Sequence, residues 1–182
     1  MRSLPIVALA AVVAAWPAHA SLVHFAPVTL EQLLAQSTLV AVGKRVKPDE
    51  RAGYRSGDEA FTIVEVLKGP PARRGQTVLV APANRALMDA MSAHYAAHGN
   101  EGMPSPIVTS YASSLADARY LATPKVIVFL TCPSDEPGTA CAFAVEHAHE
   151  AVAKRGEILR LLKQKAIDDV LVDLAQPRPA AR

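Results

Sequence analysis

The stretch Glu59-Ala-Phe-Thr-Ile-Val-Glu-Val-Leu-Lys-Gly69 is the most informative segment of this chain for the fold. Its β-branched and aromatic residues suit a pleated, half-buried surface, so the stretch predicts a β-strand. Gly69 and the two prolines that follow it cannot continue a strand ladder, which ends the strand abruptly. Apolar segments at 39–46 and 77–81 lie on either side of it, and a three-stranded meander is the simplest local arrangement.

The composition indicates one globular domain. The chain has 182 residues, of which 51% are hydrophobic and 20% are charged, which is typical of a folded protein with a single core. A net charge of +2 is too small to indicate nucleic acid or an anionic membrane as a partner. Aromatic residues are also not interleaved with basic ones, so the sequence does not predict nucleic-acid binding.

The first twenty residues are typical of a signal peptide. Arg2 is followed by an apolar run at 4–15 and by the Ala18-His19-Ala20 cleavage pattern, which predicts Ser21 as the mature N-terminus. The run is shorter than the about 20 residues that span a bilayer. We therefore expect export to the periplasm or the medium, with no membrane span after cleavage. An uncleaved anchor and a buried N-terminal helix are the alternatives.

Cys132 and Cys141 flank a segment rich in turn-forming residues. In an oxidising compartment such a pair predicts a structural disulfide across a hairpin-like loop. A metal site is the weaker interpretation, because the CxxC spacing is absent and no histidine lies between the cysteines. A redox-active pair is normally closer together in sequence.

Other patterns supply the remaining elements. Thr29 and Gln32 form a capping-box pattern at the start of a helix over 29–37, and Gly43 within the strand over 38–46 predicts a bulge. Further predicted elements are a helix at 85–98 with Asn84 as its cap, an exposed loop at 99–111, a helical turn at 113–120, strands at 125–131 and 141–147, a helix at 152–174 and a disordered tail at 176–182. The run at 125–131 is apolar almost throughout, which is typical of a strand buried on both faces.

The order of these elements predicts a mainly β fold with flanking helices. Five strands, with a helix between the third and the fourth, have the connectivity of an OB-fold barrel. We expect one OB-like domain over 21–175, whose N-terminal, inserted and C-terminal helices cover the open ends of the barrel. A two-layer α+β domain with an open sheet is the alternative.

The segments TLEQLLAQSTLVAVGKRV, FTIVEVLKG, KVIVFL and EILRLL resemble those of a group of secreted bacterial proteins. That group is similar to the netrin-like and TIMP-like (tissue inhibitor of metalloproteinase) OB modules. The likeness lies in scattered pieces between Leu30 and Leu162, and it implies a barrel. TIMP-like inhibitors chelate the protease zinc through an N-terminal cysteine, whereas the N-terminus expected here is Ser21. The resemblance therefore does not imply inhibition by that route.

Histidines are the candidate metal ligands. His94 and His98 are four residues apart, so on a helix they share a face, but no glutamate follows His94 as the zinc-protease motif requires. His147 and His149 would lie on one side of a strand and, with Glu146 or Glu150, could hold zinc or copper. Paired histidines are common on exposed faces, however, and the favoured interpretation is that all four are ordinary surface histidines, with the metal site as the alternative.

Motifs of catalysis do not appear in the sequence. It contains no GxSxG elbow, P-loop or GxGxxG, and no pattern places a histidine beside Ser110, Ser113 or Ser114. We therefore expect a non-enzymatic module without a cofactor, which binds a protein or a small ligand. The alternative is a histidine-dependent metal-binding protein or a metal-assisted hydrolase.

Overall fold

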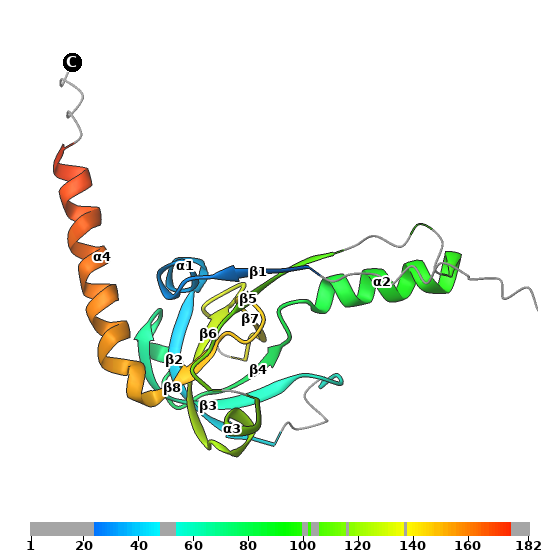
Figure 1. The fold of residues 1–182 in the computed structure, drawn as a ribbon. Coiled ribbons are helices and arrows are strands. Elements are labelled where there is room, and N and C mark those ends of the chain that lie inside the picture. The colour runs from blue at the N-terminus through cyan, green and yellow to red at the C-terminus, as the bar shows by residue number, and fades with distance from the viewer. Residues whose placement is uncertain are drawn as a thin grey trace, which may run out of the picture.

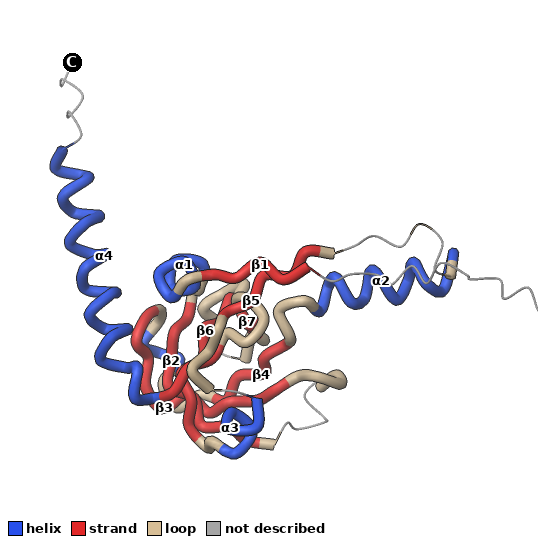
Figure 2. The backbone as a smooth tube through the Cα atoms, viewed as in Figure 1, coloured by secondary structure: helices blue, strands red, loops and turns tan. Residues whose placement is uncertain are grey.

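The computed structural model describes residues 24–47, 54–99, 102, 106–115, 117–136 and 138–175. The expected signal peptide at 1–20, its cleavage between Ala20 and Ser21, and the tail at 176–182 lie outside the described residues. Figure 1 shows a β-barrel body from which two helices extend, and Figure 2 separates the strands from the helices.

The strands and helices alternate irregularly along the chain. The strands are β1 (His24–Val28), β2 (Leu39–Val46), β3 (Glu59–Lys68), β4 (Thr77–Ala81), β5 (Ile107–Tyr111), β6 (Lys125–Thr131), β7 (Cys141–Phe143) and β8 (His149–Ala151). The α-helices are α1 (Leu30–Gln36), α2 (Arg85–His98), α3 (Asp117–Ala122) and α4 (Arg155–Ala175). Short 3₁₀ turns, η2 (Pro71–Arg73) and η3 (Val152–Lys154), precede β4 and α4.

Five strands close into a barrel in the order β2-β3-β4-β7-β6, because β6 returns to pair with β2. Neighbouring strands are antiparallel except β4 and β7, which are parallel. Two short strands pair with β6 one after the other: β8 with its first half and β7 with its C-terminal end. The OB-like barrel that the sequence predicts is confirmed, and the open-sheet alternative is wrong.

The long pair β2–β3 contains the bulge predicted at Gly43. The register between these strands shifts between Val42 and Gly43. A Cβ atom at Gly43 would lie 3.1 Å from the Cβ and Cδ1 atoms of Phe61 on the facing strand. Glycine therefore suits this position, because it lets the aromatic ring lie directly against the backbone of β2 without displacing Phe61.

Alternate residues of the strands fill the barrel. The buried interior includes Leu39 and Ala41 of β2, Phe61 and Ile63 of β3, and Val128 of β6. The rings of Phe61 and Phe143 meet edge to face, with centroids 6.2 Å apart. Interdigitated apolar side chains of this kind supply most of the free energy that stabilises a small barrel.

A second apolar cluster lies on the outer face of β2 and β6. Val40, Val42, Ile127 and Phe129 point into it, and it is covered by Leu33 and Leu34 of α1 and by Ile158 of α4. The strand β6 is therefore buried on both faces, as its continuous apolar sequence predicts.

Helix α1 is fixed at both ends. The predicted capping box forms, since the Thr29 hydroxyl accepts from the N–H of Gln32 and the Gln32 side chain accepts from the N–H of Thr29. At the other end, Lys68 Nζ donates to the carbonyl oxygens of Leu34 and Ser37, both at 2.6 Å. Burial and the nearby charge of Lys165 lower the pKa of Lys68. The end of the central strand thus caps the helix that precedes the barrel.

The inserted helix α2 does not cover an end of the barrel as the sequence predicts. It contains no buried residue and extends away from the body (Figure 1). Its base is held by Asp58, which accepts a 2.8 Å hydrogen bond from the N–H of Arg55 and pairs with Arg85. In the part of the chain that the structure describes, no helical segment has the length and hydropathy that a membrane crossing requires.

Two predicted segments differ from the structure. The loop expected at 99–111 contains β5, which pairs in parallel with β1, a strand that the sequence analysis missed. The strand expected at 141–147 ends at Phe143, and the chain turns at His147, whose φ of 56° is not that of an extended backbone. The chain then forms β8 beside β6.

Candidate functional site: a pocket at the mouth of the barrel

One end of the barrel carries a pocket of about 400 Å³. The end of β4, the start of β3, the end of β7 and helix α3 meet there, as the strand directions require. Its polar lining is formed by Glu59, Tyr120, Glu146, His147 and His149. Apolar residues complete the wall, namely Pro82, Leu121, Phe143 and Ala148. We call this cavity the mouth pocket.

Tyr120 of α3 is the central side chain of the mouth pocket. Its ring stacks on His149, with centroids 3.7 Å apart and an angle of 18° between the planes. The guanidinium carbon of Arg45 lies 4.0 Å from the same ring centroid. Two groups this close to one centroid cannot share a face, so Tyr120 is held between a cation and an imidazole.

Glu59 joins Arg45 to Tyr120. Its Oε2 accepts from the Tyr120 hydroxyl at 2.7 Å and from Arg45 Nε at 3.1 Å. The other arm of Arg45 donates to the backbone carbonyl of Tyr120 at 2.9 Å. Burial, together with the negative charge of Glu59, raises the pKa of Tyr120 well above its usual range. The phenol therefore stays protonated and fixed in position at neutral pH.

The two histidines of the pocket occupy different environments. His149 is 3% exposed, and its Nε2 lies 3.4 Å from the carbonyl oxygen of Leu115. His147 is exposed and lies on the turn before β8, with its ring centroid 6.3 Å from that of His149. The prediction that both rings lie on one side of a single strand is wrong, because β8 begins only at His149.

Glu146 lines the mouth pocket on a segment whose backbone is hydrogen-bonded to β5. Its carbonyl accepts from the N–H of Tyr111 at 2.9 Å, and its N–H donates to the carbonyl of Thr109 at 3.0 Å. Strand β5, which the sequence analysis interpreted as loop, thus positions this residue. Its Oε1 is buried and has no hydrogen-bond partner among the described residues. A buried carboxylate oxygen in this state calls for a donor.

Glu150 is buried next to His149 and links β5, β8 and the segment at Ser114 through its hydrogen bonds. It is 1% exposed, and it accepts hydrogen bonds from the Tyr111 hydroxyl at 2.9 Å, from the N–H of Ala151 at 2.7 Å and from the hydroxyl and N–H of Ser114. Burial opposes ionisation of Glu150, but these hydrogen bonds outweigh it, so its pKa lies below the usual range. Glu150 is therefore a structural carboxylate and is already fully bonded.

His94 and His98 lie together on α2, with ring centroids 5.0 Å apart. The structure thus places the candidate metal ligands as two pairs, one on this helix and one at the mouth pocket. Within the described ranges, no group of three or more His, Cys, Asp or Glu side chains is arranged to hold a metal ion. The alternative of a metal centre built from these histidines therefore finds no geometric support there.

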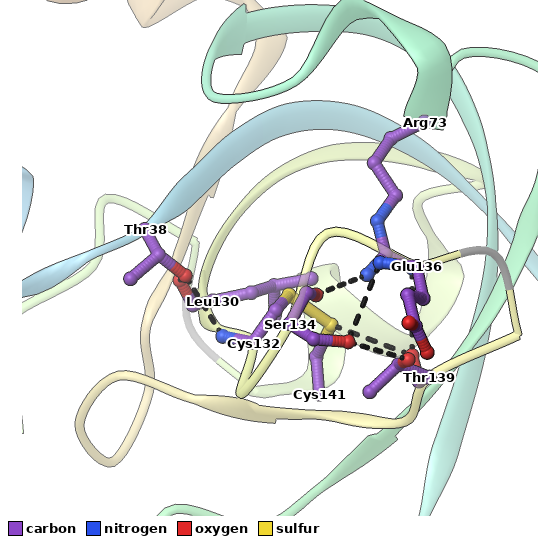
Figure 3. The surroundings of a disulfide bond; sticks show 8 residues. All are labelled: Thr38, Arg73, Leu130, Cys132, Ser134, Glu136, Thr139 and Cys141. Carbon is purple, nitrogen blue, oxygen red and sulfur yellow. Dashed lines mark hydrogen bonds between the residues drawn. A yellow bond between two sulfur atoms is a disulfide. The ribbon is translucent and has the colours of Figure 1, made fainter.

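The opposite end of the barrel is closed by the cysteine loop. The sulfur atoms of Cys132 and Cys141 are 2.10 Å apart and their Cα atoms 4.4 Å apart, so the two residues are bonded as predicted. Figure 3 shows the side chain of the buried Arg73 pointing toward the loop, where its Nη2 donates to the Ser134 carbonyl at 2.6 Å. In the chain-entropy model, closing a loop of this length stabilises the fold by about 2–3 kcal/mol.

Glu59 and Tyr120, which line the pocket, and Arg45, which holds Tyr120 in place, were not predicted from the sequence. A usable signal exists for Arg45 and Glu59, because both occupy positions that continue the inward-facing alternation of their strands. A charge at such a position predicts a buried ion pair or a site. Tyr120 offers no comparable signal, since its place depends on how α3 docks.

Comparison with protein-family models, with curated proteins and with solved structures finds no significant match to this chain. The mouth pocket must therefore be interpreted from its own geometry and chemistry.

Proposed function

We propose that this protein is an exported, non-enzymatic binding module that takes a small organic ligand in the mouth pocket. The observation that carries the proposal is a cavity of about 400 Å³ in which carboxylate, phenol and imidazole groups converge beside an apolar wall. Small-molecule sites are typically concave and mostly apolar with a few fixed polar groups, and the mouths of barrels are a preferred location.

Preorganisation supports binding as the task of the pocket. Tyr120 is held by Glu59, Arg45 and His149 before any ligand arrives. Glu146 is held by backbone hydrogen bonds on both sides of its peptide unit. A ligand that enters such a site does not have to order the wall, which leaves more of the contact energy for affinity.

The protonation states favour binding over acid–base chemistry. With its pKa raised and its proton donated to Glu59, Tyr120 is a poor general base. Glu150, the other buried acid nearby, already accepts hydrogen bonds from Ser114 and Tyr111, so its carboxylate is not available to take a proton from a ligand. Tyr120 can therefore orient a ligand, and it has little tendency to exchange protons with it at neutral pH.

Export can be tested directly on protein recovered from the periplasm or the medium. We expect an intact mass that begins at Ser21, because Ala18-His19-Ala20 precedes it. Unfolding without reductant should reveal no titratable thiol, since Cys132 and Cys141 are bonded. A retained leader, or two reactive thiols in exported protein, would contradict the proposed compartment.

Ligand binding is tested by titrating a chemically diverse fragment set while proton–carbon NMR spectra of the aromatic side chains are recorded. Fragments that bind should shift the signals of His147, His149 and Tyr120 and leave those of His94 and Tyr95 on α2 unchanged. Shifts confined to α2, or no shift at millimolar fragment, would refute the proposed site.

A matched pair of variants sharpens this test. Leu121 is 72% exposed and lines the mouth pocket, whereas Ile107 is 70% exposed and does not. Leu121→Ala should weaken fragment binding by about three- to tenfold, because each buried methylene contributes about 0.8 kcal/mol at most. Ile107→Ala should leave the dissociation constant unchanged. An equal effect of both variants would count against binding at the mouth.

A further inference from the structure

The least satisfied polar atom of the mouth pocket is Oε1 of Glu146. It is buried without a hydrogen-bond partner among the described residues, although its residue lines a cavity large enough for a ligand. An unpaired buried acceptor is unfavourable by about 1–3 kcal/mol, and by more when it is charged. A ligand that donates to this atom would remove that penalty.

The second carboxylate of the pocket is already neutralised. Glu59 forms its ion pair with Arg45 at 3.1 Å and accepts the Tyr120 hydroxyl. Glu146 has no ion pair among the described residues. The pocket therefore keeps an uncompensated negative group at a fixed position, because β5 holds the Glu146 backbone.

We propose that the ligand of the mouth pocket is a small cationic amine with an apolar body. Its ammonium group donates to Glu146 Oε1, and its apolar part lies against Phe143 and Leu121. This inference rests on the proposed function, and it adds the chemical class of the ligand. Charge-assisted hydrogen bonds are about twice as strong as neutral ones, so the amine outcompetes a neutral isostere.

Three probes of similar size separate the possibilities: phenethylamine, phenethyl alcohol and hydrocinnamate. Their dissociation constants are measured by NMR titration of the full mature chain at about pH 8, where free imidazole is neutral. Phenethylamine should bind about tenfold more tightly than the alcohol. Hydrocinnamate should bind most weakly, because Glu59 and Glu146 both line the pocket.

The acid probe tests a real competitor. Arg45 Nη2 is also buried without a hydrogen-bond partner among the described residues, and an anion would satisfy it. Arg45 does not line the mouth pocket, however, and its charge is paired with Glu59, which does. Tighter binding of hydrocinnamate than of phenethylamine would therefore overturn the amine assignment while leaving pocket binding intact.

Glu146→Gln supplies the residue-level test. This variant should lose about tenfold in affinity for phenethylamine and should no longer distinguish it from the alcohol. Glu136→Gln is the matched control, since Glu136 is an exposed acid on the cysteine loop at the far end of the barrel. Retained amine preference in folded Glu146→Gln protein would overturn the inference.

The outcomes separate the two proposals. If none of the three probes, and no other fragment, shifts the signals of the mouth pocket, the proposed binding function itself fails. If the probes bind there without preference for the amine, only the further inference fails. Should Glu146→Gln not fold, the amine-to-alcohol affinity ratio of the wild-type protein decides the matter, because it needs no variant.

Discussion

Replacing Phe61 by alanine is expected to lower the free energy of unfolding by about 3–5 kcal/mol, the largest effect of any single truncation that we predict. Phe61 is fully buried in the barrel, its ring meets Phe143 edge to face, and it lies directly on the backbone of Gly43. Truncation would leave a cavity that a closed barrel cannot collapse to fill. The lost burial of the ring and the cavity therefore both lower the free energy of unfolding.

Urea unfolding followed by far-UV circular dichroism measures this effect. In a domain of this size, each 1 kcal/mol corresponds to about 2–4 °C, so the melting temperature should fall by about 6–20 °C. Val64→Ala is the control on the same strand, because Val64 is 37% exposed and its truncation should change stability by at most about 1 kcal/mol. Similar losses in both variants would contradict the assigned barrel interior.

The barrel could be predicted because each of its longer strands has a local sequence pattern typical of a β-strand. The stretch at 59–68 and the run at 125–131 carry the β-branched and apolar residues of strands, and Gly43 marks the bulge where β2 bends. Thr29 and Gln32 likewise signal the start of α1 through a contact three residues apart. Each of these signals lies within a few residues of the feature that it predicts.

The β1–β5 pair could not be predicted in the same way. Its two strands are far apart in sequence and pair in parallel, and each is short and contains or follows a proline. Local composition at 99–111 therefore favours a loop, although the pairing of β5 both with β1 and with Glu146 decides its conformation. Tertiary contacts override weak strand propensity in such segments.

The mouth pocket was only partly predictable. His147, His149, Glu146 and Glu150 were singled out as possible metal ligands, and all four lie at or behind the pocket. Their roles differ because the backbone turns at His147, which buries His149 and Glu150 while it leaves His147 exposed. The spacing of the histidines in the sequence does not predict a turn at a single residue such as His147.

Glu150 is expected to be the polar residue whose replacement destabilises the fold most. Glu150→Ala would leave the Tyr111 hydroxyl, the Ser114 N–H and the Ala151 N–H without their acceptor inside the protein. Each hydrogen bond to a buried charge contributes about 1.5–3 kcal/mol, so we expect a loss of about 3 kcal/mol or more. Because Tyr111 ends β5, the ribbon that positions Glu146 should loosen as well.

The pH dependence identifies the charge as the cause. The pKa of Glu150 is lower in the folded than in the unfolded chain, so its contribution is fully present above the ordinary glutamate pKa of about 4.3. As the pH falls below that value, the unfolded chain takes up a proton first and the contribution is lost. The difference in unfolding free energy between wild type and Glu150→Gln should therefore be largest near neutral pH and shrink on acidification.

Urea unfolding of wild type, Glu150→Gln and Glu157→Gln, repeated from neutral pH down through the glutamate range, tests this expectation. Glu157 forms an exposed ion pair with Lys154 at 2.8 Å, so its replacement should change stability by no more than about 0.5 kcal/mol at any pH. A Glu150→Gln difference that grows on acidification, instead of shrinking, would show that the carboxyl is protonated in the folded protein at neutral pH. Glu150 would then donate a proton to one of its partners, and the hydrogen-bond directions assigned around Tyr111 and Ser114 would be wrong.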